Sequence, residues 1–124
     1  MPKILIVDDE PHIRLLLEQT LEEFEDQGID ILKAENGRQA LDLIQREKPD
    51  LVYLDVMMPE MNGYEVCRTV KFDMKLDDIF IVLLTAKGQE FDKKKGLEVG
   101  ANIYVTKPFD PDFIVEKTRE VLKV

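Results

Sequence analysis

Cysteine, histidine and long apolar runs are scarce in this sequence. One cysteine and no signal peptide fit a reducing cytoplasm, where we expect the protein to reside. The longest apolar runs are far too short to cross a membrane, so we expect no membrane insertion. The only histidine, His12, falls in the first turn of a predicted helix, which favours a solvated or weakly paired side chain over a phosphorelay donor.

Positive charge is scarce as well, with 17 Lys and Arg against 26 Asp and Glu and a net charge of −9. A non-specific nucleic-acid binder needs a basic face, so we expect no direct contact with nucleic acid. A charged fraction of 35% beside 44% hydrophobic residues is typical of an ordinary globular protein. The length of 124 residues, without a linker or repeat, predicts one domain over residues 1–124.

Short apolar runs alternate with helical segments along the whole chain, a pattern typical of α/β proteins with a parallel sheet. We predict five strands, at about residues 3–7, 30–34, 51–54, 79–84 and 102–105. The first and third are continuous apolar runs, as expected of strands that are covered on both faces.

A helix is predicted after each strand. The first starts after Glu10 with Pro11 and runs to Phe24, with apolar residues at i, i+3, i+4 and i+7. The others start, in chain order, at Asn36-Gly37, Asn62-Gly63, Gly88 and Asp110-Pro111, and Gly100 ends the fourth. Repeated strand–helix units are compatible with a doubly wound sheet or with a fragment of a barrel. The small size of the chain favours the doubly wound sheet.

Reactive polar groups stand where four of these strands end: Asp8-Asp9, Asp55, Thr85 and Thr106-Lys107-Pro108. In an open parallel sheet all strand C-termini face one edge, which is where such folds build their sites. Carboxylates, a hydroxyl and an ammonium would therefore meet at one place. This combination predicts a site that handles a phosphoryl group.

The three carboxylates of Asp8, Asp9 and Asp55 need a cation or raised pKa values. Two like charges ~5 Å apart repel by roughly 3 kcal/mol at an effective dielectric constant of about 20. A hard divalent ion such as Mg²⁺, with Mn²⁺ as an alternative, prefers oxygen ligands of this kind. Asp8 and Asp9 could instead serve only as helix caps, just as Lys107 and Thr85, each taken alone, could be surface and strand-end residues.

Asp55 is the best candidate for a nucleophile, because an ionised group at the end of a buried strand needs a reason to exist. A carboxylate can form an acyl phosphate by in-line attack when cations neutralise the phosphoryl oxygens. Lys107 supplies one such positive charge.

Together these residues closely resemble the receiver domains of two-component response regulators, of the single-domain chemotaxis type. The resemblance rests on Asp8-Asp9, on Asp55 with residues 57–63 (Met-Met-Pro-Glu-Met-Asn-Gly), on Thr85-Ala86 and on Lys107-Pro108-Phe109. It covers essentially the whole chain. It implies a flavodoxin-like, doubly wound parallel sheet of five strands in the order 2-1-3-4-5, with five helices on both faces.

The resemblance also implies roles for single residues. Asp55 would be the phosphoacceptor, and Mg²⁺ would be held by Asp8, Asp9, Asp55 and the backbone carbonyl of Met57. Phosphoryl oxygens would be bound by Thr85, the backbone of Ala86, and Lys107. Thr85 and Tyr104 would form the switch, although Tyr104 could also be ordinary strand filler. Met57 and Lys87 would flank the path of the hydrolytic water, and we expect them to make the phosphorylated form long-lived.

The implied function is a signalling switch and not a metabolic enzyme: the protein would promote only its own phosphorylation and slow dephosphorylation. The donor would be a sensor histidine kinase or a histidine phosphotransfer protein. The output would be a protein partner on the face of the fourth helix, fifth strand and fifth helix. The chain ends just after the fifth predicted helix, so it would be either a stand-alone receiver or a piece of a longer regulator.

Three other functions are less well supported by the residues. A phosphatase of the haloacid dehalogenase type wants a second acid two positions after the nucleophile, where this chain has Met57. A flavin or nucleotide module would place phosphate at Asp8-Asp9-Glu10, whose charge repels it. A degenerate receiver that only binds partners would lack one of the expected site residues, and all are present.

Overall fold

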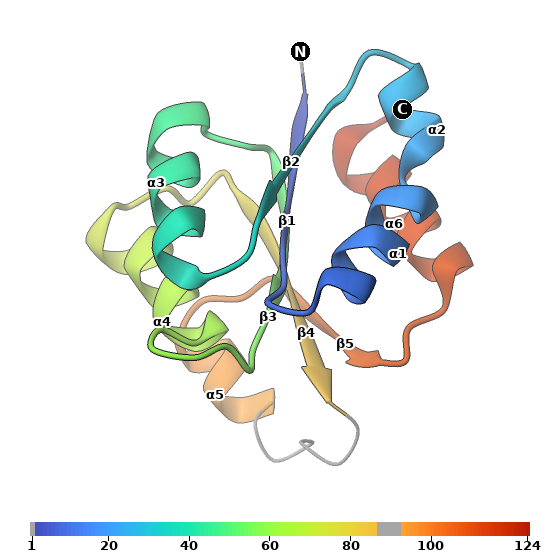
Figure 1. The fold of residues 1–124 in the computed structure, drawn as a ribbon. Helices are drawn as coiled ribbons and strands as arrows, with labels where there is room; N and C mark the ends of the chain where they lie inside the picture. The colour runs from blue at the N-terminus through green and yellow to red at the C-terminus, as the bar shows by residue number, and fades with distance from the viewer. Residues whose placement is uncertain (1, 87–92) are drawn as a thin grey trace.

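The computed structural model describes residues 2–86 and 93–124, which form a five-stranded parallel sheet (Figure 1). The strands are β1 (Lys3–Val7), β2 (Asp30–Ala34), β3 (Leu51–Asp55), β4 (Phe80–Ala86) and β5 (Ile103–Lys107). Their order across the sheet is β2-β1-β3-β4-β5, and every neighbouring pair is parallel. The predicted flavodoxin-like topology is confirmed, with β3 at its centre.

Three strands extend one or two residues farther than the sequence predicted. Asp55 pairs with Leu84, and Ala86 pairs with Lys107, because the strand pairing continues to these residues. Asp55 and Lys107 therefore belong to the sheet, whereas Asp8 directly follows β1. Strand pairing fixes the backbone positions of these two strand residues.

The connections within the described ranges contain six α-helices: α1 (Pro11–Thr20), α2 (Glu22–Asp26), α3 (Gly37–Glu47), α4 (Gly63–Arg68), α5 (Lys93–Glu98) and α6 (Pro111–Leu122). The single first helix of the prediction is divided at Leu21, whose backbone leaves the helical region (φ −97°, ψ 6°). Leu21 and Phe24 are nevertheless fully buried. Apolar spacing thus predicted the burial of Leu21 and Phe24, although Leu16 of the same pattern is 41% exposed, and it carries no information about a break at one residue.

Most helix starts follow the signals in the sequence. Asn36 caps α3, Asp110 caps α6, and Asn62 forms a capping box with Glu65 at the start of α4. The predicted start of the fourth helix at Gly88 lies outside the described residues. Gly100 follows α5 with a φ of 87°, a conformation that favours glycine at a helix end.

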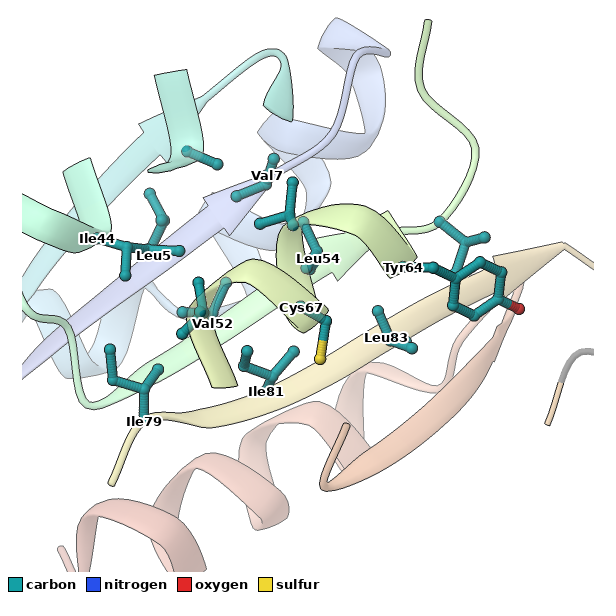
Figure 2. Close-up of a cluster of buried hydrophobic side chains, with 14 of the residues drawn as sticks. Leu5, Val7, Ile44, Val52, Leu54, Tyr64, Cys67, Ile79, Ile81 and Leu83 are labelled. Atoms are coloured by element: carbon teal, nitrogen blue, oxygen red, sulfur yellow. The ribbon is translucent and has the colours of Figure 1, made fainter. Parts of the chain in front are cut away.

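The helices cover both faces of the sheet, with α1, α2 and α6 on one side and α3, α4 and α5 on the other (Figure 1). Two hydrophobic clusters result. Figure 2 shows the cluster on the side of α3 and α4, where Leu5, Val52 and Ile81 of three neighbouring strands lie beside Ile44 and Cys67. All five side chains are fully buried. Among the described residues, no helix is long and apolar enough to span a membrane.

A π-helical turn, η1 (Thr69–Asp73), continues α4 and carries a buried lysine. Lys71 donates from Nζ to the carbonyl of Ile79 at 2.6 Å and to Oδ1 of Asn102 at 3.0 Å. These bonds join η1 to the starts of β4 and β5, at the end of the sheet opposite the polar strand termini.

Candidate functional site

Asp8 and Asp55 meet because they end neighbouring strands. Asp8 directly follows β1, which pairs Val7 with Leu54, and Asp55 is the last residue of β3. Asp8 is fully buried and Asp55 is 3% exposed, whereas the following Asp9 is exposed. One carboxylate oxygen from each of the three lies within 4.8 Å of the others. The structure thus brings together the acids that the sequence predicted to be neighbours.

Lys107 reaches these acids from β5, with β4 lying between β5 and β3. Its Nζ lies 2.9 Å from Oδ2 of Asp8 and 3.0 Å from Oδ1 of Asp55. Burial works against its charge, but hydrogen bonds to Asp8 and Asp55 outweigh that effect and raise the pKa of Lys107 above its usual value. The ammonium therefore stays charged and bridges the two buried carboxylates.

The surroundings of Asp55 disfavour the ionised form of its carboxyl group. Burial, followed by the neighbouring charge of Asp8, raises its pKa to about 7, although Lys107 acts in the opposite direction. Within the part of the chain that the structure describes, the ammonium of Lys107 is the one positive charge in contact with this cluster of three carboxylates. A second cation would relieve the remaining repulsion, and a cluster of carboxylate oxygens is the donor set that Mg²⁺ takes. The residues present therefore fit a divalent metal site.

Two further residues hold the Asp8 turn in place. Glu10 donates its backbone N–H to Oδ1 of Asp8 at 2.9 Å, and Arg14 donates from its guanidinium to the backbone carbonyl of Asp8 at 2.7 Å. The Glu10 carboxylate also lies 3.8 Å from Lys107. Neither residue was predicted from the sequence to belong to the site. The position of Glu10 beside two candidate ligands was the available signal, whereas no local pattern marked Arg14.

The loop after β3 folds back tightly on Asp55. Val56 donates its N–H to the carbonyl of Leu84, and Gly63 donates to the carbonyl of Val56. A Cβ on Gly63 would lie 2.4 Å from the backbone oxygen of Asp55, so only glycine fits there. The sequence marked Asn62-Gly63 as a helix start, but not as this close contact.

The other candidate residues that the structure describes lie on β4, on β5 and in the loop after β3. Thr85 is 7% exposed on β4 and lies one residue beyond Leu84, the partner of Asp55. Tyr104 on β5 is 40% exposed, and Met57 is 60% exposed. Ala86 is the last residue of β4. Lys87 lies outside the described residues.

The chain matches the family model of the response regulator receiver domain over residues 4–119. It is 44% identical over 121 residues to the alkaline phosphatase synthesis transcriptional regulatory protein PhoP of Bacillus subtilis, covering 98% of this chain and 48% of PhoP. It is 48% identical over 120 residues to the phosphate regulon transcriptional regulatory protein PhoB of Pseudomonas aeruginosa, covering 97% of this chain and 51% of PhoB. The chain thus spans about half the length of these curated relatives.

Solved structures agree with this relationship. The chemotaxis protein CheY4 of Vibrio cholerae superposes with a TM-score of 0.84 at 33% identity, over 98% of each chain. The family match, the level of identity and the strand order lead to the same conclusion. This chain belongs to the receiver domain family of the two-component response regulators, a family of signalling domains.

Proposed function

We propose that Asp55 accepts the phosphoryl group in this receiver and that Asp8, Asp9, Asp55 and the backbone carbonyl of Met57 hold Mg²⁺. The observation that carries the proposal is the bridge made by Lys107 between Asp8 and Asp55, beside the third carboxylate. An ammonium already in contact with the nucleophile is well placed to meet the oxygens of an incoming phosphoryl group.

The reaction that we propose is an in-line displacement. A carboxylate oxygen of Asp55 attacks the phosphorus of a phosphohistidine, and a P–O bond forms as the P–N bond breaks. The electron pair leaves with the imidazole nitrogen, which then takes up a proton. Lys107, Thr85 and the backbone N–H of Ala86 bind the phosphoryl oxygens. A bound Mg²⁺ would neutralise charge on the transferring group.

The signal would then travel through β4 and β5. An aspartyl phosphate adds charge and oxygen acceptors beside Thr85, whose hydroxyl can donate to them. Movement of Thr85 toward the phosphoryl group would leave room for Tyr104, now 40% exposed, to turn inward. The surface that changes is formed by α5, β5 and α6, where a downstream protein would bind.

We infer that the phosphoryl donor is a sensor histidine kinase or a histidine phosphotransfer protein in the cytoplasm. The related PhoP and PhoB are transcriptional regulators that are about twice as long as this chain. An analogous role is a proposal for any longer protein that contains this domain. The domain itself, with a net charge of −9, would act through protein contacts and not on nucleic acid.

The decisive experiment is phosphorylation with acetyl phosphate and Mg²⁺. The parent should take up one phosphoryl group as an acid-stable, alkali-labile acyl phosphate, and peptide mapping should place it at Asp55. Asp55→Asn should lose the label, whereas Asp78→Asn, at an exposed carboxylate outside the cluster, should keep it. Undiminished labelling of Asp55→Asn would overturn the assignment.

The lifetime of the acyl phosphate should be minutes or longer, as an order-of-magnitude estimate from poor positioning of water. Hydrolysis needs a water molecule in line behind phosphorus, and a thioether is only a weak hydrogen-bond acceptor. We propose that Met57, together with Lys87, is responsible for slow turnover. Met57→Asn should shorten the lifetime, because an amide both accepts from and donates to water.

A further inference from the structure

Met57 differs sharply from the methionine that follows it. Its side chain is 60% exposed, whereas that of Met58 is 8% exposed. Met61 and Met74 are partly buried against the hydrophobic cluster of α3 and α4. Within residues 2–86 and 93–124, Met57 is therefore the methionine that a small oxidant in solution reaches most easily.

The only cysteine does not compete for such an oxidant. Cys67 is fully buried, and its Sγ donates to the carbonyl of Val99 at 3.4 Å. Burial raises the pKa of the thiol to about 11, so it stays protonated near neutral pH. Peroxides react with the accessible thiolate and not with a buried thiol. Met57 is thus the sulfur atom available for oxidation at this edge.

The backbone around Met57 is held firmly beside the site. Val56 is hydrogen-bonded to Leu84, and Gly63 is hydrogen-bonded to Val56 and packed against the carbonyl of Asp55. A chemical change on the Met57 side chain would therefore take place two residues from the nucleophile, on a backbone that cannot easily move away.

We propose that Met57 is a redox-modification site at which sulfoxide formation shortens the lifetime of the aspartyl phosphate. This inference rests on the proposed function of Asp55. Hydrogen peroxide transfers one oxygen atom to the thioether: an S–O bond forms, the O–O bond breaks, and water leaves. The sulfur loses two electrons, and the peroxide gains them.

The expected effect follows from hydrogen bonding. A thioether sulfur barely accepts hydrogen bonds, whereas oxidation makes the side chain polar and gives it an oxygen acceptor. That oxygen can hold a water molecule beside the phosphoryl group. One such bond should accelerate hydrolysis about fivefold. Oxidation would then couple the duration of the signal to peroxide, and methionine sulfoxide reductases would reverse it.

The test compares hydrolysis before and after oxidation. The protein is treated with limiting hydrogen peroxide, freed of oxidant, and phosphorylated with acetyl phosphate and Mg²⁺. Loss of the acyl phosphate is then followed with time, while peptide mass mapping locates the sulfoxide. We expect Met57 to be oxidised before Met58, Met61, Met74 and Cys67, and the lifetime to fall about fivefold. Treatment with the two sulfoxide reductases should restore it.

Three variants separate this effect from general damage. Met57→Leu keeps the apolar bulk without sulfur and should retain its lifetime after peroxide. Met58→Leu alters the buried neighbour and should respond as the parent does. Met57→Asn should be short-lived with or without peroxide.

Each outcome decides one claim. Earlier oxidation of Met58, Met61, Met74 or Cys67, or an unchanged lifetime once Met57 is a sulfoxide, would overturn the inference. An equal response of Met57→Leu would do the same, because the effect would then arise elsewhere. Failure of the untreated parent to become labelled at Asp55 would instead refute the proposed function.

Discussion

Lys107 and Lys71 lie at opposite ends of the sheet and among very different partners. Lys107 lies between the carboxylates of Asp8 and Asp55, and its side chain is 17% exposed. Lys71 is 8% exposed and is bonded to uncharged oxygens, namely the carbonyls of Asp77 and Ile79 and the amide of Asn102. The first site has an excess of negative charge, whereas at the second the ammonium is hydrogen-bonded only to dipoles and the carboxylates of Asp77 and Asp78 act on it only as neighbouring charges.

The pKa values respond in opposite directions. Carboxylate partners overcome the effect of burial at Lys107 and raise its pKa, whereas burial dominates at Lys71 and lowers its pKa. An ammonium among carboxylates can exchange partners when a phosphoryl group or a metal arrives. An ammonium that satisfies carbonyls has no such alternative. The partners of a buried charge, more than its burial, therefore distinguish a reactive site from a structural one.

The largest effect should come from removing the structural lysine. Lys71→Ala deletes a buried side chain and leaves the carbonyl of Ile79 without its donor, which should lower the free energy of unfolding by about 3 kcal/mol. Lys71→Met keeps most of the apolar stem and should lose about 2 kcal/mol. Urea denaturation measures both. A loss below about 0.5 kcal/mol in both variants would show that Lys71 is not a structural anchor.

The two lysines also differ in how well their positions could be predicted from the sequence. Lys107 could be predicted because it ends a strand, and parallel strands bring their C-terminal ends to one edge whatever loops lie between them. Lys71 was missed because its partners at residues 77, 79 and 102 share no spacing or motif with it. A weaker signal existed: Lys71 falls four residues after the buried Cys67, on the apolar side of the helix.

Other contacts could or could not be predicted from the sequence for the same physical reason. Asp8, Asp9 and Asp55 could be predicted as neighbours because strand order places β1 beside β3. The break at Leu21 and the contact of Arg14 with Asp8 could not be predicted. They depend on backbone angles and side-chain reach, which leave no period in the sequence.

A second prediction concerns metal binding. Lys107 contacts two of the proposed Mg²⁺ ligands, so its ammonium repels the metal and competes with it for oxygens. Lys107→Met should raise Mg²⁺ affinity about tenfold, as expected for removal of a charge a few ångströms away. Titration with Mg²⁺, followed by the rise in melting temperature, measures this.

Two controls belong to the metal experiment. Lys71→Met should leave Mg²⁺ affinity unchanged, because Lys71 lies at the opposite end of the sheet. Asp9→Asn should abolish the thermal shift. If Asp9→Asn responded to Mg²⁺ as the parent does, or if Lys107→Met bound the metal more weakly, the electrostatic picture of this edge would be wrong.

A smaller effect should appear in the pH dependence of stability. The pKa of Lys71 in the folded protein lies below the ordinary value of 10.5, which the unfolded chain retains. Between these two values the unfolded chain binds more protons than the folded protein, so the contribution of Lys71 to stability rises with pH. The stability gap between the parent and Lys71→Met should therefore widen toward pH 10.5.

Urea denaturation at a series of pH values measures that gap. Lys94→Met, at an exposed position on α5, supplies the background change that loss of any lysine causes. A gap that narrows as the pH rises would mean that the Lys71 ammonium is favoured by the fold and not penalised.

The smallest effect should come from making the structural site resemble the reactive one. Oδ1 of Asn102 accepts from both Lys71 and the backbone N–H of Ile81, and a carboxylate of nearly the same shape could accept from both. Asn102→Asp should therefore make the bond from the Ile81 N–H charge-assisted, turn the bond from the Lys71 ammonium into an ion pair, and stabilise the fold by about 0.5 kcal/mol near neutral pH. It should also raise the pKa of Lys71 and remove the widening of the stability gap with pH.

Urea denaturation of Asn102→Asp, with and without Lys71→Met, isolates the coupling between the two side chains. Because Asn102 lies far from the Asp8, Asp9 and Asp55 cluster, Mg²⁺ affinity should not change. A destabilised Asn102→Asp that still binds Mg²⁺ normally would mean that desolvation of the new carboxylate exceeds its attraction to Lys71, and that neutral partners are the better solution at a purely structural site.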